Sequence, residues 1–108
     1  MTFTELLGEV KKLKHEEVRT DTPEFFEMVI AKDSLTVILP ILDKFFGRPI
    51  KPANIKPSGE ARKAADPYGG IRSDQTLYYL EDGGKGFYGM LWPWGSGVLV
   101  TLKLIRGK

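Results

Sequence analysis

Hydrophobic and polar residues alternate along residues 98–105, near the end of the chain. The two-residue period of an extended strand places one apolar set on a single face, namely Val98, Val100, Leu102 and Leu104. Two earlier runs, 76–81 and 87–92, are rich in aromatic residues, and glycine-containing turn sequences separate the three runs. This pattern predicts a three-stranded antiparallel meander.

A different spacing occurs at the start of the chain, where apolar residues recur at steps of three and four. The members of this stripe are Phe3, Leu6, Leu7, Val10 and Leu13. Thr2 and Glu5 have the spacing of a capping box, so an amphipathic helix is expected to begin here. The charged residues that follow, as far as Arg19, are interpreted as the solvent face of the same helix.

A second helical stripe covers residues 35–46, and Gly47 follows it where a left-handed cap is expected. Pro40 lies inside this stripe, and an interior proline either kinks a helix or marks the start of a new one. A kinked helix is favoured because the stripe keeps its phase across the proline. Residues 25–31 are interpreted as a strand from their aromatic and β-branched content, although Thr22 before Pro23 also resembles a helix start.

Regular patterns fail in residues 47–73, which contain four prolines and three internal glycines; Ser58 before an alanine-rich turn is the one helical hint. Loops of this length are uncommon in compact domains and tend to be functional or disordered. The chain is therefore predicted to be one α+β domain over residues 1–108, with two helices packed on one face of a mainly antiparallel four-stranded sheet. The predicted order is helix, strand, helix, long loop and three-stranded meander.

Composition narrows the possible functions. The 108 residues are 42% hydrophobic and 28% charged, which is typical of a single globular domain. The absence of cysteine excludes disulfides, thiolate catalysis and cysteine metal sites, and a single histidine argues against imidazole-rich metal sites. No apolar run approaches the roughly 20 residues of a membrane-spanning helix, and the first residues do not resemble a signal peptide, so a cytoplasmic location is expected.

Catalytic signals are weak, and no catalytic residue, cofactor or metal is predicted. His15 is expected on an exposed helical face with no nucleophile close to it in the sequence. Gly84, Gly86 and Gly89 match the phosphate-binding pattern G-x-G-x-x-G, but the residues after them continue as a strand and not as a helix. They are therefore interpreted as hairpin glycines.

The aromatic residues of the meander are the main candidates for binding. Tyr88 and Trp92 share one face of the middle strand, and either Tyr78 or Tyr79 joins them, depending on the register of the first strand. This face is either open to a partner or covered by the long loop. The covered arrangement is favoured, because aromatic strands are usually packed.

Residues 66–75 form a second candidate, because two glycines there lie beside the polar side chains of Tyr68, Arg72 and Asp74. These groups suit a small anionic or polar ligand. The alternative, which is favoured, is a structural turn in which Arg72 pairs with an acid.

The sequence is compatible with two functions. The first is a small non-enzymatic binding or accessory domain that engages a protein partner, or a second copy of itself, through the sheet aromatics and the long loop. Trp92 and Trp94 would be its anchors, since aromatic residues dominate interface hot spots. The alternative is single-stranded nucleic-acid binding, in which bases stack on aromatic side chains beside a basic loop. The net charge of +2 does not by itself require a polyanionic partner.

Overall fold

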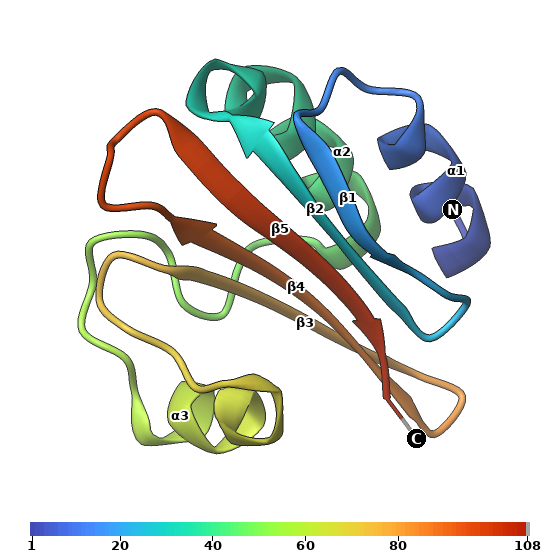
Figure 1. Ribbon diagram of the computed structural model, residues 1–108. Coiled ribbons are helices and arrows are strands. Elements are labelled where there is room, and N and C mark those ends of the chain that lie inside the picture. Colours follow the sequence, from blue (N-terminus) through green and yellow to red (C-terminus); the bar gives the residue numbers. More distant parts are fainter. Residues whose placement is uncertain (108) are drawn as a thin grey trace.

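The computed structural model describes residues 1–107 and contains a five-stranded antiparallel sheet with helices on both of its faces (Figure 1). The strand order is β1-β2-β5-β4-β3. The elements, in chain order, are α1 (Phe3–Lys11), β1 (Glu17–Asp21), β2 (Phe25–Ala31), η1 (Lys32–Ser34), α2 (Leu35–Phe46), α3 (Gly59–Ala65), η2 (Asp66–Tyr68), β3 (Thr76–Asp82), β4 (Lys85–Pro93) and β5 (Leu99–Arg106). The Cα radius of gyration is 12.8 Å, close to the value of about 13 Å expected for a compact domain of this length.

The predicted meander is confirmed as β3, β4 and β5. Asp82 pairs with Lys85, so the first hairpin turns on two residues only, Gly83 and Gly84, whose φ angles are +60° and +80°. Such a turn needs positive φ at both central positions, which glycine adopts without strain. This tight turn sets the register of the whole hairpin and pairs Tyr79 with Tyr88.

The predicted strand at Phe25–Ala31 is also confirmed, and it pairs with β5 along its full length. The prediction of four strands is wrong, because Glu17–Asp21 forms a fifth, β1, at the edge of the sheet beside β2. The first helix ends at Lys11 and does not extend to Arg19. The missed strand has almost no buried side chains, so it carries no hydrophobic period, and its pairing with β2 defines it.

Helices α1 and α2 cover one face of the sheet, here called the inner face. Residues at 0% exposure from both helices and from the sheet meet in this core, including Leu6, Ile38 and Leu102. Helix α2 continues through Pro40, and Gly47 ends it as predicted, with a positive φ of +78°. Its ψ of −151° differs from the left-handed cap that the sequence suggests. Gly89 on β4 lets Phe46 approach, since a Cβ there would lie 2.8 Å from its ring.

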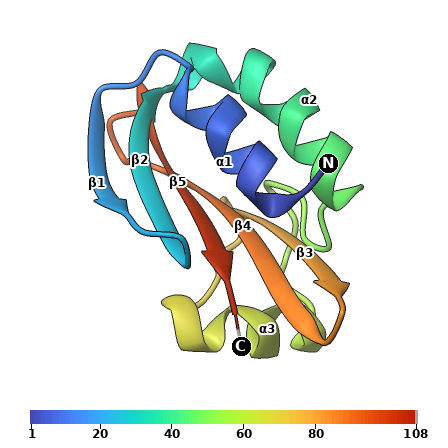
Figure 2. The same cartoon turned by 90° about the vertical axis from the view of Figure 1, so that its right-hand side faces the viewer.

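The third helix, α3, packs on the opposite, outer face (Figure 2). Its alanines join strand residues in a second apolar cluster, which contains Ala61, Ala65, Leu77, Met90 and Ile105. Helices are therefore not confined to one face, and residues 47–73 are not a loop throughout. The hint at Ser58 was correct, because its hydroxyl accepts from the Ala61 amide at 3.1 Å. A seven-residue helix that buries only small side chains has too weak a pattern to be predicted firmly.

Candidate functional site

The outer face of the sheet is divided into two halves. The half formed by β3, β4 and the end of β5 lies under α3. Over β1 and the middle of β2 and β5, no helix of residues 1–107 covers the outer face (Figures 1 and 2). We call this second region the open half-face, and its defining side chains are Arg19, Glu27, Trp94 and Lys103. Trp92 on β4 lies at its border, where it also packs against the cluster under α3.

Trp94 is the best-fixed side chain of the open half-face. Its indole Nε1 donates a hydrogen bond to Thr101 Oγ1 at 2.8 Å, and its backbone N–H donates to the Leu99 carbonyl at 2.9 Å. The guanidinium carbon of Arg19 on β1 lies 5.3 Å from the indole ring centroid. The ring therefore lies beside Thr101 on β5, within reach of the Arg19 side chain from β1. Thr101 and its partner on β2, Val29, are only 5% and 1% exposed.

Trp92 is held between two partners. The ammonium of Lys103 lies 3.4 Å from the centroid of its ring, within the range of a cation–π interaction, which contributes about 0.5 to 2 kcal/mol. From the loop side Gly69 approaches so closely that a Cβ there would lie 2.7 Å from the ring. Burial lowers the pKa of Lys103, and the charge of Glu27 acts in the opposite direction. One face of the Trp92 ring is thus occupied by Lys103, and the backbone at Gly69 lies against the Cη2 edge of the ring.

The charges of the open half-face are mixed. Arg19 contacts Glu17 at 3.3 Å and Glu27 at 3.8 Å, and Lys103 pairs across the sheet with Glu27. Two cations and two carboxylates therefore share this region and its edge. The Arg19 and Glu17 side chains are half exposed, and such surface pairs contribute at most about 1 kcal/mol each. A surface with this balance does not attract a polyanion strongly.

The covered half contains a tyrosine cluster. The Tyr88 ring lies 4.6 Å from Tyr68 and 5.1 Å from Tyr79, measured between ring centroids. Burial is the main cause that raises the pKa of Tyr88. A hollow of about 240 Å³ beside the cluster is lined by Tyr79, Tyr88 and loop and helix residues that include Ile50 and Lys63. The loop therefore covers Tyr88 in part.

Tyr78 lies apart from the other candidates, on the inner face. Its side chain is 2% exposed and its hydroxyl donates to Asp43 Oδ1 at 2.7 Å. Burial, together with this hydrogen bond and the Asp43 charge, raises the pKa of Tyr78 far above its ordinary value. The register of the hairpin decides this position, because Tyr79 and not Tyr78 faces the same side as Tyr88.

Arg72 and Asp74 lie in the exposed turn before β3. Their side chains are 72% and 52% exposed, and Arg72 Nε lies 3.8 Å from Asp74 Oδ1. The Arg72 amide donates to Gln75 Oε1 at 2.8 Å, which closes the turn. Of the seven candidate residues, the structure therefore brings Tyr68 together with Tyr88, and Trp92 and Trp94 onto one sheet face.

Lys51 is a buried charged residue that carried no sequence signal. It is 2% exposed, and its ammonium donates to the carbonyls of Pro52, Ser73 and Gln75 at 2.8, 2.6 and 2.5 Å. Its backbone also bridges Leu77 on β3. The side chain ties both ends of the long loop to the edge of the sheet. Every residue has a backbone carbonyl, so no sequence pattern predicts a site that is built from these acceptors.

Comparisons with known proteins add no relative: no protein-family model matches the chain, and no match was found among curated proteins or solved structures. Within residues 1–107, no cluster of three or more histidine or acidic side chains is placed to hold a metal ion. None of the helices in this range has both the length and the apolar character needed to cross a bilayer.

Proposed function

We propose that this protein is a small non-enzymatic binding domain that engages a protein partner, or a second copy of itself, through the sheet aromatics and the adjoining long loop. The observation that carries the proposal is the open half-face, where Trp94 is held in place over sheet that no helix of the described residues covers. A cytoplasmic location accompanies the proposal as a prediction.

The composition of the open half-face fits a protein partner. Tryptophan and arginine are among the residue types enriched in interface hot spots, and the Arg19 guanidinium lies over the Trp94 ring here. Hydrogen bonding has already ordered the indole, so little side-chain entropy is lost when a partner binds. The alternating charges of Arg19, Glu27 and Lys103 supply hydrogen-bonding groups around this aromatic centre.

Backbone pairing at the β1 edge is a less suitable mode of association. β1 has five residues, its register shifts between Val18 and Thr20, and charged side chains lie along it. Short, irregular and charged edges are the usual protection against strand addition. The proposed contact therefore uses the face of the sheet and not its edge.

Nucleic-acid binding has weaker support. Base stacking requires a free aromatic ring face, whereas Lys103 lies over a face of Trp92 and Arg19 lies over a face of Trp94. The open half-face also carries carboxylates that would repel phosphates.

Sedimentation velocity at increasing protein concentration tests the version in which the partner is a second copy. Self-association that Trp94→Ala abolishes and Val37→Ala leaves intact is the expected result. Val37 is a suitable control because it is 52% exposed on α2, away from the outer face.

If wild type sediments as a monomer throughout, the self-association version is wrong. Affinity capture from a lysate then compares wild type, Trp94→Ala and Val37→Ala, and a partner retained equally by all three contradicts the proposed surface. A titration with labelled oligonucleotides at two salt concentrations completes the test. Binding that weakens steeply with salt would replace the proposal with the nucleic-acid alternative.

A further inference from the structure

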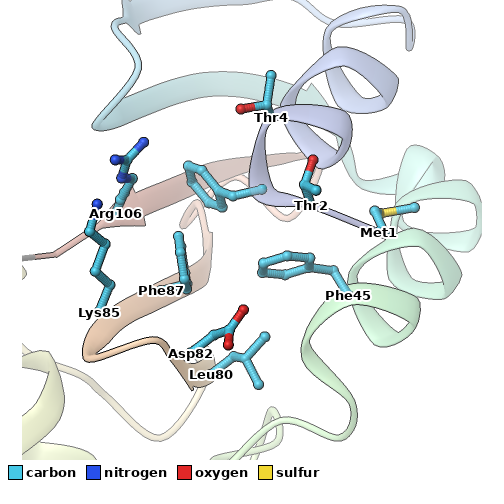
Figure 3. Close-up of a pocket in the computed structure, with 10 residues that line it drawn as sticks. Met1, Thr2, Thr4, Phe45, Leu80, Asp82, Lys85, Phe87 and Arg106 are labelled. Atoms are coloured by element: carbon cyan, nitrogen blue, oxygen red, sulfur yellow. The ribbon is translucent and has the colours of Figure 1, made fainter.

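A separate hollow of about 320 Å³ opens at one end of the layer between the inner face and its helices (Figure 3). It lies where the start of α1, the end of α2, the β3–β4 hairpin and the end of β5 meet. This position is on the opposite face of the sheet from the open half-face. The volume is at the lower limit for small-molecule sites.

The floor of this hollow is aromatic. Phe87 on β4 lies 5.7 Å from Phe45 on α2 and 5.1 Å from Phe3 on α1, measured between ring centroids. Leu80 on β3 completes the apolar lining. Phe45, Leu80 and Phe87 are only partly buried, although they pack against the main core. The core therefore presents apolar surface to the hollow without being sealed there.

Two cations lie on one side of the hollow. Arg106 on β5 pairs with Phe87 on β4, and Lys85 is two residues from Phe87 on the same strand. The side-chain period therefore places Lys85 and Arg106 on the inner face with Phe87. In Figure 3 their charged ends lie near each other. Neither side chain forms an ion pair within residues 1–107.

The lining also contains one acid, Asp82, at the turn of the hairpin. In Figure 3 its carboxylate lies by Leu80, away from the guanidinium of Arg106. Among the side chains that line the hollow, Lys85 and Arg106 against Asp82 leave an excess of one positive charge. This balance suits a monoanion better than a polyanion.

We infer that this hollow binds a small organic monoanion, namely a carboxylate with a short apolar body. The apolar body lies on Phe45, Leu80 and Phe87, where it removes exposed apolar surface from water. The carboxylate lies at Lys85 and Arg106, since a guanidinium and an ammonium donate strong charge-assisted hydrogen bonds to it. The site shares no residue with the proposed protein-binding surface, so either can fail without the other.

A titration with octanoate, monitored by the backbone amide chemical shifts in NMR spectra, tests this inference. We expect saturable shifts centred on Leu80, Phe87 and Arg106, with a dissociation constant on the order of a millimolar for a ligand of this size. The uncharged analogue octanol should bind about tenfold more weakly or worse, because it loses the charge-assisted hydrogen bonds.

Variants assign the carboxylate position. Lys85→Gln with Arg106→Gln should weaken octanoate binding about tenfold or more, while Lys14→Gln, on an exposed lysine outside the hollow, should leave it unchanged. Lys85→Gln alone, at the exposed hairpin end, is the second variant if the double variant unfolds, and it should weaken binding in the same direction. Equal binding of octanol and octanoate, shifts centred elsewhere, no saturable shift, or an unchanged affinity in the Lys85 variants would each overturn the inference.

Discussion

The two faces of the sheet are covered in different ways. On the inner face, two helices bring large apolar side chains such as Leu6 and Ile38 onto the strands. On the outer face, a short helix contributes alanines to one half, and the other half, which no helix of residues 1–107 covers, presents the side chains of Arg19, Trp94 and Lys103. The inner face therefore supplies most of the apolar burial. On the outer face, contacts between individual side chains take the place of such burial. Part of this face therefore stays accessible to a binding partner.

Substitutions at two neighbouring residues of β5 should show the largest difference in stability between the two faces. Leu102 is 0% exposed on the inner face, and Thr101 is 5% exposed on the outer face under Trp94. Leu102→Ala should lower the free energy of unfolding by about 2 to 5 kcal/mol through the lost burial and the cavity left behind. Thr101→Ala should lower it by only about 1 kcal/mol, since one hydrogen bond is lost. Urea denaturation measures both values, and equal losses would contradict the contrast between the faces.

A variant of Lys51 tests how the long loop is attached to the edge of the sheet. Lys51→Met keeps the length of the side chain but leaves the carbonyls of Ser73 and Gln75 without their donor. The free energy of unfolding should fall by about 2 to 3 kcal/mol, less whatever water recovers. Amide hydrogen exchange should accelerate at Leu77, whose N–H donates to the Lys51 carbonyl at 3.0 Å.

Lys56→Met is the matched control for Lys51→Met. Lys56 is exposed in the same loop, so its replacement should change stability by no more than about 0.5 kcal/mol. If the two variants behave alike, the three carbonyl contacts do not hold the loop to the sheet.

The smallest expected difference in stability is between two glycine variants beside Trp92. Their comparison separates steric fit from backbone strain. Gly69 and Gly70 have φ angles of +104° and +79°, so alanine strains the backbone at both positions. Only at Gly69 would the new Cβ also collide with the Trp92 ring, at 2.7 Å, whereas nothing lies within 4 Å at Gly70. Gly69→Ala should therefore destabilise by about 1 kcal/mol more than Gly70→Ala.

Chemical denaturation combined with tryptophan fluorescence measures this difference. The emission of Gly69→Ala should change, because the indole must move, and that of Gly70→Ala should stay close to wild type. The same stability loss in both variants would mean that the loop adjusts and that Trp92 is not clamped.

Several elements were determined by short-range sequence signals. The capping box at Thr2, the apolar stripe of residues 35–46 and the glycine turn at 83–84 each combine neighbouring residues with a known backbone preference. The strand period of 98–105 correctly separated the inner-facing Leu102 from the outer-facing Lys103. These features depend on residues a few positions apart, so the order of helices and strands was largely predictable.

The rest depended on contacts between distant parts of the chain. β1 is a strand only because β2 lies beside it, and α3 is stable because its alanines meet Leu77 and Met90. The Lys51 site joins carbonyls 22 and 24 residues away in the sequence. The sequence alone determined a meander with two helices and aromatic strands. Only tertiary packing decided that Tyr78 is buried, that Trp92 is clamped by Lys103, and that half of the outer face stays open, because each outcome requires partners that no local pattern specifies.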